Sequence, residues 1–544
     1  MSRLIEPVIL LLLCAVVITP SLLLSADAAV GAPTRDLFDH LALLDVWSLS
    51  VVDWNYPEGG SLVPPDLFGM LLAAPWMGLS RTAAYNIATL CQLWLACLAA
   101  WALGRRFGSG LVCGVAYGLS PFLIGQVMSG EAETLSAWPL PLMVLLLLST
   151  RRAAWVGAGA IGAIGALGSW YYGAFMAILI ALWTLLRGRL WAADRDVAVL
   201  LAPLTFAALI LGPALAYARI LASPEQLFRG PDMATYLAEQ PRALAAMSSD
   251  PLAWIGAGAA GATSHVDAIP WIVLGLTGLG LWHWRRSDAP CSVWWVVGLT
   301  GLALVLSVGP VLHINGAPVL SVTPYRLLMA IPPLDLMRLP HRWMLVATLG
   351  LAVLAARGAS LMPRLFGGLI FLETLWFVAP PILSTTVTPP AVVARITGPV
   401  LELPTRTLGQ DARGRYLLWQ RTHRQPTPYA LLMQGWSPQL AAEPLVIAVA
   451  ALDTRDRIWE QTVEARQFRQ EAFAEAVAAW RDDPDETVLV ESRARLQSLG
   501  FVQVVLHRDL LHGDDELNIT LLIEKALGEG EEVEDALLWE LTDE

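Results

Sequence analysis

The sequence of 544 residues is poor in charge, in lysine and in cysteine. Charged residues make up 15% of it, against about a quarter in ordinary soluble domains. Lysine occurs once, at Lys525, and no basic stripe of the kind that binds nucleic acid is present. The five cysteines lie in or beside apolar segments, without the spacing of zinc ligands or the density of a disulfide framework. A nucleic-acid-binding module and a disulfide-rich secreted domain are therefore excluded.

Apolar side chains are what the sequence has in excess. Hydrophobic residues make up 56% of the chain and the mean hydropathy is +0.56. A soluble protein cannot bury so large an apolar fraction, so the composition predicts an α-helical polytopic membrane protein whose partner is the lipid bilayer. Much of the net charge of −12 comes from an acidic tail near residues 514–535, so the apolar part is close to neutral.

The apolar segments predict about eleven membrane spans. The first covers residues 7–24, and its length favours a retained helix over a signal peptide cleaved after Ala28. Further segments lie at residues 83–103, 109–127, 134–149, 153–168, 171–186, 197–217, 269–283, 292–310, 341–356 and 361–379. The segment 62–79 is apolar too, but prolines and Asp66 interrupt it. We expect it to be interfacial or re-entrant.

Arginine placement supports that topology. If residues 62–79 do not cross the membrane, the arginine pairs at 105–106, 151–152 and 285–286 fall on the same side as Arg3. That is the positive-inside pattern, with a cytoplasmic N-terminus. The first outer loop then covers residues 25–60, and further outer loops cover 128–133, 218–268 and 311–340.

A change of composition near residue 385 indicates a second domain. We expect a transmembrane domain over residues 1–384 and a small extracytoplasmic α/β domain with an acidic tail over residues 385–544. Alternation and turn signals predict strands at 400–404, 416–419, 501–507 and 536–541. They predict helices at 455–481, 491–499 and 517–527.

The first outer loop gathers Asp36, Asp39 and His40 beside an apolar segment. On a helix, residues three and four apart are neighbours, so the three side chains would share a face. A carboxylate at the membrane surface suits a general base. The same oxygens also suit a divalent cation, which would be the cofactor. A third interpretation is helix capping, with Asp36 in the first turn.

Two further outer segments carry charge next to predicted spans. Glu131 and Glu133 occupy a short polar loop, where they either join a site or form a simple turn. Arg338 precedes the span at 341–356, and His341 and Arg342 are its first two residues. Guanidinium groups bind phosphate in a bidentate manner, which fits a lipid phosphate headgroup. Interfacial anchoring of long basic side chains is the alternative.

Short motifs lie in a recognisable order along nearly the whole chain. They are RDLFDH at 35–40, NYPEG at 55–59, AYN at 84–86, GE at 130–131 before WPLP at 138–141, MRLPHR at 337–342 before ARG at 356–358, and LGFVQVVLH at 499–507. In this order the chain resembles the GT-C superfamily of polytopic membrane glycosyltransferases, and especially its YfhO-like bacterial branch.

The resemblance implies a glycosyltransferase of the bacterial inner membrane that acts on its outer face. It would transfer a sugar from a polyprenyl-phosphate donor to an envelope glycan, lipid or protein acceptor. An acidic residue of the first outer loop, here Asp36 or Asp39, would be the catalytic base. The residue types suggest that His40 and Glu131 assist and that Arg338, His341 and Arg342 bind the lipid phosphate.

Two other classes stay open from the sequence, so enzyme activity is a hypothesis here. A transporter or flippase of envelope lipids would need ionisable groups inside its spans, and Glu373 is the main one present. A non-catalytic membrane scaffold would use the C-terminal domain to bind partners. It predicts that Asp36 and Asp39 can be neutralised without effect.

Overall fold

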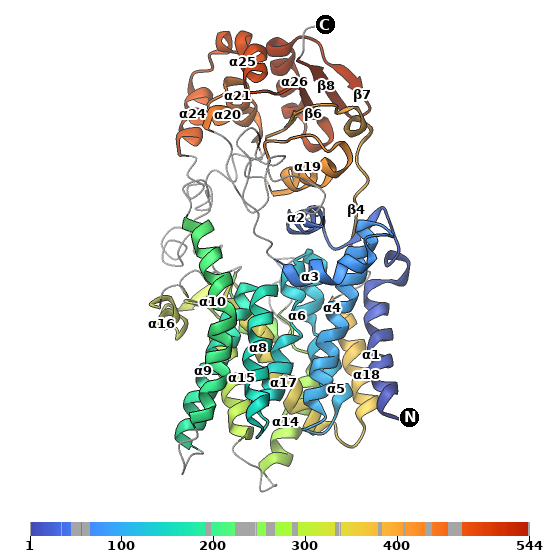
Figure 1. The fold of residues 1–544 in the computed structure, drawn as a ribbon, viewed down its shortest axis with the longest axis vertical. Helices are drawn as coiled ribbons and strands as arrows, with labels where there is room; N and C mark the ends of the chain where they lie inside the picture. The colour runs from blue at the N-terminus through green and yellow to red at the C-terminus, as the bar shows by residue number, and fades with distance from the viewer. Residues whose placement is uncertain are drawn as a thin grey trace. The chain divides into compact units, whose positions relative to one another are not determined.

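The computed structural model describes residues 2–33, 35–44, 56, 66–190, 197–222, 245, 247–256, 267–285, 292–331, 334, 337, 339–378, 383–405, 410–429, 438–454 and 471–541. The chain forms two compact units (Figure 1). The first unit comprises Met1–Ala32, Pro65–Leu215 and Asp232–Thr385. The second comprises Pro33–Pro64, Ala216–Pro231 and Thr386–Glu544.

Helices follow the apolar segments of the sequence. The longer ones are α1 (Ser2–Ile18), α4 (Arg81–Gly104), α8 (Arg152–Gly168), α9 (Trp170–Leu190), α10 (Leu201–Ala222), α14 (Trp271–Arg285), α15 (Ser292–Ser307), α17 (Met344–Gly358) and α18 (Pro363–Val378). Shorter ones are α3 (Leu67–Ala73), α5 (Gly110–Gly118), α6 (Pro121–Ser129), α7 (Pro139–Leu147), α13 (Pro251–Trp254) and α16 (Tyr325–Met329). Helices suit such segments because they satisfy every backbone polar group internally.

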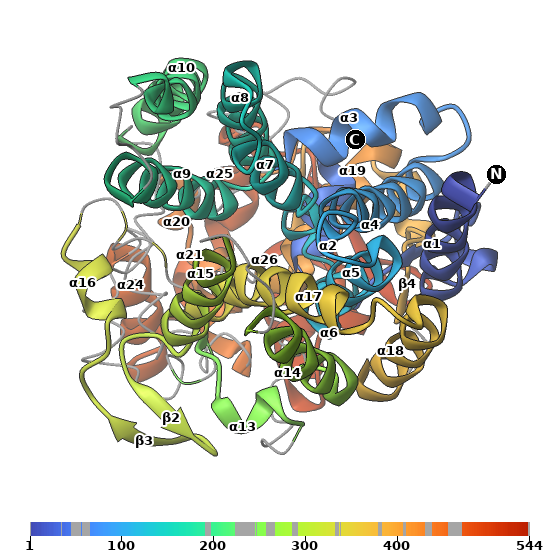
Figure 2. The same cartoon turned by 90° about the horizontal axis from the view of Figure 1, so that it is seen from below.

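Short 3-10 helices and strands connect these helices. The 3-10 helices are η1 (Pro20–Leu22), η3 (Ala74–Trp76), η4 (Ala132–Leu135), η5 (Val197–Leu200) and η7 (Pro340–Trp343). Strand β1 (Ala28–Val30) pairs with β4 (Ser384–Thr386), and β2 (Leu312–Ile314) pairs with β3 (Ala317–Leu320). Figure 2 shows the β2–β3 hairpin at the margin of the helices.

Three stretches of the described chain are long and apolar enough to cross a membrane. They are Arg81–Gly104, Gly110–Ser129 and Ala198–Ala216. Several apolar helices of 10–17 residues accompany them. A predominantly helical membrane protein is therefore confirmed in general terms, whereas eleven spans, the sidedness of the loops and the interfacial placement of residues 62–79 stay predictions.

Close helix packing relies on small residues. A Cβ atom on Gly280 of α14 would collide with the carbonyl oxygen of Leu354, and one on Gly358 of α17 would collide with that of Leu276. Small residues let apolar helices approach until their backbones touch. Gly358 belongs to the ARG motif at 356–358, so this motif has a packing role in the bundle.

The predicted span at 109–127 is broken into two helices, and the second carries the candidate site. Helix α5 ends at Gly118, and Ser120 then caps α6 by accepting a hydrogen bond from the N–H of Leu123 (3.4 Å). Pro121 is the first residue of α6, a position where its missing N–H costs nothing. Helix α6 ends at Ser129, and the left-handed Gly130 that follows (φ 75°) turns the chain into the acidic residues.

Asn86 of the AYN motif holds the segment that precedes the first acidic loop. Its amide nitrogen donates to the carbonyl oxygens of Leu22 (2.6 Å) and Ala28 (3.0 Å), and its oxygen accepts from the N–H of Val30 (2.9 Å). Three hydrogen bonds from one fully buried side chain fix this stretch against α4. Asn86 therefore has a structural role within the first unit, since it fixes residues 22–30 to helix α4.

The second unit contains a four-stranded sheet in the order β5–β6–β8–β7. Strands β5 (Val400–Leu403) and β6 (Gln503–His507) are parallel, while β8 (Ala536–Glu540) is antiparallel to both β6 and β7 (Glu531–Val533). Its helices are α2 (Arg35–Leu43), α19 (Gln410–His423), α20 (Pro438–Ala441), α21 (Pro444–Leu452), α24 (Glu471–Asp482), α25 (Ser492–Ser498) and α26 (Asp514–Leu527). Short 3-10 helices η8 (Ala391–Arg395), η10 (Glu486–Glu491) and η11 (Arg508–Leu510) complete it.

Most of the secondary structure predicted for this unit is present, and one element is wrong. The strands near 400, 503 and 536 and the helices near 492 and 517 form as expected. The helix at 455–481 is present as α24 in its described part. Residues 416–419, predicted as a strand, lie inside helix α19. A four-residue apolar run covers a full helical turn, and all four side chains are buried. Hydrophobic periodicity therefore could not distinguish a helix from a strand here.

Candidate functional site

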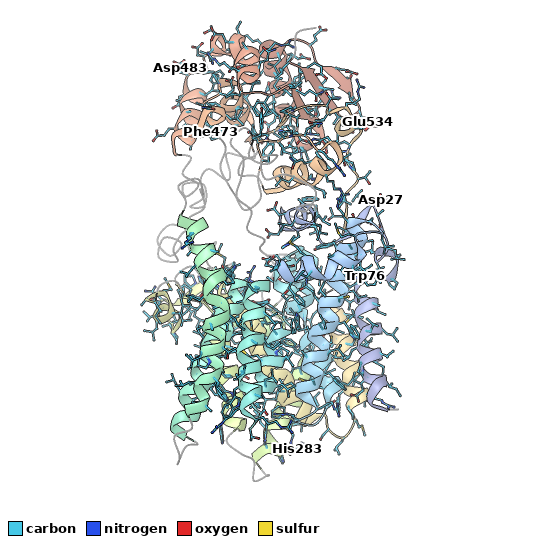
Figure 3. All side chains as sticks on the ribbon, viewed as in Figure 1. Asp27, Trp76, His283, Phe473, Asp483 and Glu534 are labelled. Atoms are coloured by element: carbon cyan, nitrogen blue, oxygen red, sulfur yellow. The ribbon has the colours of Figure 1, made fainter. Side chains whose placement is uncertain are left out.

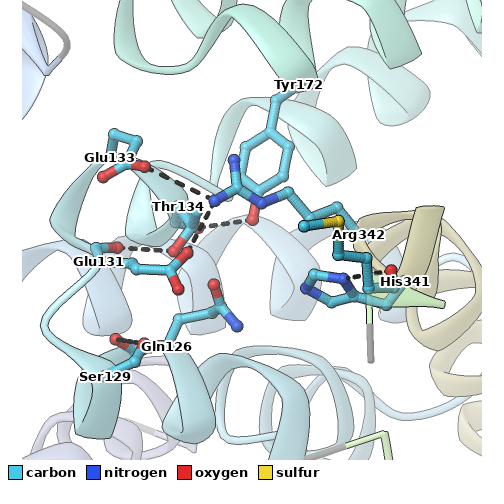
Figure 4. A network of polar contacts seen from close by, with 9 residues as sticks. Gln126, Ser129, Glu131, Glu133, Thr134, Tyr172, His341 and Arg342 are labelled. Atoms are coloured by element: carbon cyan, nitrogen blue, oxygen red, sulfur yellow. Dashed lines mark hydrogen bonds and ion pairs between the residues drawn. The ribbon is translucent and has the colours of Figure 1, made fainter. Parts of the chain in front are cut away.

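Two segments of the first unit that lie far apart in sequence meet in a buried ion-pair cluster (Figure 4). Arg342 Nη2 lies 2.7 Å from Glu131 Oε2 and 3.6 Å from Glu133 Oε1. Glu131 precedes η4, Glu133 lies within it, and Arg342 belongs to η7. The Arg342 side chain is 6% exposed and that of Glu131 is 11% exposed. The sequence singles out these three residues, but it does not show that they pair.

Tyrosines from the start of α9 complete this cluster. The Arg342 Cζ atom lies 4.5 Å from the centre of the Tyr171 ring, which is a cation–π contact. The Tyr172 hydroxyl donates to the carbonyl oxygen of Thr134 (2.7 Å), and the Thr134 hydroxyl donates to that of Glu131 (2.6 Å). These contacts hold the acidic turn in one conformation. Neither tyrosine could be assigned to this site from the sequence, because aromatic residues at the end of an apolar segment have many possible roles.

The charges of the cluster bear on what it can bind. Two carboxylates and one guanidinium leave a formal charge of −1 among Glu131, Glu133 and Arg342. Burying such a set costs solvation energy that is recovered only by close pairing. Arg342 is already engaged by carboxylates, so an incoming phosphate would meet a negative surplus here. Its role as a phosphate ligand stays a prediction, and the electrostatics favour a neutral ligand.

His341 and Arg338 complete the basic segment of the sequence analysis. The His341 ring is fully buried, and its Nδ1 lies 3.0 Å from the carbonyl oxygen of Met247. The Phe122 ring of α6 is its neighbour, at 6.2 Å between ring centres. His341 is therefore anchored in the fold next to the cluster. Arg338 lies outside the described residues.

The acidic residues of the first loop belong to the second unit, on helix α2. Asp36 is exposed, whereas Asp39 and His40 are 8% and 7% exposed. Helix α2 packs against α19, and the Arg415 guanidinium lies over the Phe38 ring at 5.5 Å. Positions three apart are offset by about 60° around a helix, which is enough to expose Asp36 and bury Asp39. Of the two carboxylates, Asp36 is the one exposed to solvent.

A metal site at these residues finds no support in their geometry. Within the described ranges, no three His, Cys, Asp or Glu side chains come together in a way that could hold a metal ion. Asp36, Asp39 and His40 are all among those residues.

A second buried polar pair lies in the sheet of the second unit. Glu402 Oε1 of β5 lies 3.2 Å from His507 Nε2 of β6, and both side chains are fully buried. Desolvation raises the pKa of Glu402 well above its usual value and lowers the pKa of His507 to about 3. Burial also lowers the pKa of His423 to about 4. These directions favour a neutral pair at physiological pH.

Glu373, the main charge within a predicted span, has a structural task. Its two carboxylate oxygens accept the N–H groups of Trp271 (2.6 Å) and Ile272 (2.9 Å). Both donors belong to the first turn of α14, where N–H groups have no partner inside the helix. A carboxylate there also interacts favourably with the helix dipole. Capping explains this charge without an ion or proton pathway.

Comparisons with known proteins find a distant structural neighbour. No protein-family model matches the chain, and no curated protein matches it significantly. Among solved structures, the chain is similar to the oligosaccharyltransferase of Archaeoglobus fulgidus in its apo form, with 12% sequence identity and a TM-score of 0.45. The match covers 93% of this chain and 70% of that one.

Proposed function

We propose that this protein is an integral membrane glycosyltransferase of the bacterial inner membrane. It takes a sugar from a polyprenyl-phosphate donor and transfers it to an envelope acceptor at the outer face. The observation that carries the proposal is the buried cluster of Glu131, Glu133 and Arg342. Charges buried at the ends of apolar helices are costly and are commonly retained for function.

The motifs of the sequence resemblance add support, since several of them are in mutual contact. Glu131 and Arg342 come from two motifs and pair directly. In the second unit, Tyr56 of the NYPEG motif donates a hydrogen bond to the carbonyl oxygen of Gly500 (3.3 Å) and packs edge-on against Phe501. Gly500 and Phe501 are the second and third residues of the LGFVQVVLH motif. These contacts between motifs support the proposal.

We assign the role of catalytic base to Asp36, because it is the exposed carboxylate of α2. It would accept the proton of the acceptor hydroxyl as that oxygen attacks the sugar carbon, while the lipid phosphate leaves. Asp39 and His40 would keep α2 in position from their buried places. By residue type alone, as proposed from the sequence, Glu131 would assist and Arg338 would bind the lipid phosphate.

A scaffold or a transporter has less support. The transporter hypothesis needed an ionisable group within the spans, and Glu373 is occupied as a helix cap. The scaffold hypothesis has no observation in its favour. It makes one separable prediction, which is that neutralising Asp36 leaves function intact.

Envelope glycolipids compared by mass spectrometry test the proposal in cells. The strains are a deletion strain, the same strain with the wild-type chain, and the same strain with Asp36→Asn and Asp39→Asn together at matched membrane abundance. We expect the double variant to accumulate the unglycosylated acceptor, as the deletion does. If the deletion strain shows a glycolipid defect and the double variant has wild-type glycolipids, the assignment as an enzyme is contradicted.

A further inference from the structure

Gln126 is a buried side chain without a partner at the edge of the ion-pair cluster. It lies in α6, one turn before Gly130, and is fully buried. Neither its amide nitrogen nor its amide oxygen has a hydrogen-bond partner in the described part of the chain. Its backbone carbonyl accepts from the N–H of Glu131 (3.1 Å). In Figure 4 the amide points toward the region bordered by Glu131 and His341.

The fold satisfies a comparable buried glutamine elsewhere. Gln92 of α4 is 1% exposed, and its side-chain oxygen accepts from the Ser136 hydroxyl (2.9 Å). Buried polar groups in folded proteins nearly always have such partners, and each exception needs an explanation. Gln126 has lost its hydration without gaining a hydrogen bond. A bound ligand or an ordered water molecule would restore what it has lost.

The chemistry around Gln126 selects the kind of ligand. An amide offers two N–H donors and one acceptor oxygen. The neighbouring Glu131 carboxylate accepts hydrogen bonds, and the Nε atom of Arg342 has no partner in the described ranges. Because the cluster carries a surplus negative charge, an anionic phosphate is disfavoured. Groups that both donate and accept, held close together on a neutral molecule, match this set.

We propose that Gln126 is a specificity-determining residue that binds neighbouring hydroxyl groups of the sugar, together with Glu131. This inference rests on the proposed glycosyltransferase function. It places the neutral sugar, and not the lipid phosphate, at the cluster around Arg342. The hydrogen bonds of the Gln126 amide then form when the sugar of the donor enters.

Thermal unfolding of the purified full-length chain tests the assignment. The probes are a ten-carbon prenyl phosphate and the same lipid phosphate carrying glucose, galactose, mannose or arabinose. The sugar-dependent effect is the difference in melting temperature and in Kd between a glycosylated probe and the bare lipid phosphate. Wild type should show it for at least one sugar. Gln126→Leu should bind that sugar-bearing probe about tenfold or more weakly, and the bare lipid phosphate unchanged.

Gln92→Leu is the matched control, because it removes a buried glutamine that has a hydrogen-bond partner. Gln126→Met is a second variant at the site, which shows whether an effect of Gln126→Leu comes only from poor packing of leucine. Without ligand, Gln126→Leu should melt at or above the wild-type temperature, since no partner is left unpaired. Gln92→Leu should melt lower, because the Ser136 hydroxyl loses its acceptor. If both Gln126 variants keep the sugar-dependent effect, the inference about Gln126 is overturned and the proposed function is not. The inference about Gln126 is also overturned if, without ligand, both Gln126 variants lower the melting temperature as much as Gln92→Leu does. Gln126 would then bind a structural water molecule. A wild-type chain without any sugar-dependent effect would contradict this inference and the proposed function together.

Discussion

Replacing Arg342 by methionine would remove the guanidinium that lies between Glu131 and Glu133. The distances to the two carboxylates are 2.7 Å and 3.6 Å. At an effective dielectric constant of about 20, the corresponding attractions are about 6 and about 5 kcal/mol. Part of this energy offsets the desolvation of the charges, and loss of one partner from a buried pair costs about 3–5 kcal/mol in measured cases. We expect Arg342→Met to lower the free energy of unfolding by that amount.

Glu131→Gln should cost less than Arg342→Met. The amide oxygen can still accept from the guanidinium, and Glu133 still supplies a charge at 3.6 Å. We expect a loss of about 1–3 kcal/mol. When both residues are replaced, the total should fall short of the sum by at least about 1 kcal/mol, because the second change no longer breaks an intact pair.

Denaturant unfolding of the purified chain in detergent measures this double-mutant cycle. The four chains are wild type, Arg342→Met, Glu131→Gln and the double variant, followed by the same spectroscopic signal. If Arg342→Met costs less than about 1 kcal/mol, or if the two changes are additive, the pair does not organise the acidic turn. The site as described would then be wrong.

Two further predictions concern stability. Glu373→Ala should lower the free energy of unfolding by about 1–2 kcal/mol, because two N–H groups at the start of α14 lose their acceptor; an unchanged thermal unfolding midpoint would contradict the capping role. Below pH about 6.5, His507 and His423 take up protons in the unfolded chain. In the folded chain they do so only below pH about 3 and about 4. Acidification should therefore lower the free energy of unfolding, by at most about 1.4 kcal/mol per pH unit for each histidine. Above pH about 4.5, Glu402 cancels the effect of one of these histidines. Its raised pKa keeps the carboxyl group protonated in the folded chain at pH values where the unfolded chain has lost that proton. Denaturant unfolding at pH 7, 6 and 5 measures the slope, which His423→Gln should reduce; a flat profile for wild type would refute the assignment.

Apolar segments could be located from the sequence because the helices of a membrane protein are continuous apolar runs. Helix α4 matches its predicted segment within a few residues. The break between α5 and α6 was missed because Ser120 and Pro121 sit inside an otherwise unbroken apolar run. Residues 416–419 were misassigned for a related reason, since a run of four apolar residues fits a strand and a fully buried helical turn equally well.

The candidate site could be predicted in its residue types but not in its pairing. Glu131 and Arg342 are 211 positions apart, and nothing local to either position specifies the other. Helix α2 groups with the second unit because its apolar face packs on α19, which spacing within the loop could not reveal. Gln126 gave one usable signal, a polar residue inside an apolar run, and such residues commonly mark functional positions.

Sugar transfer by the reconstituted full-length chain tests the central claim most directly. The assay follows release of polyprenyl phosphate and glycosylation of an envelope extract from the deletion strain. The chains compared are wild type, Asp36→Asn and the control Asp27→Asn, which neutralises another exposed carboxylate (Figure 3). Loss of a general base lowers rates by about 10²–10⁴-fold, so Asp36→Asn should fall in that range while Asp27→Asn matches wild type. Transfer by Asp36→Asn at the wild-type rate, or no transfer by wild type, would contradict the account.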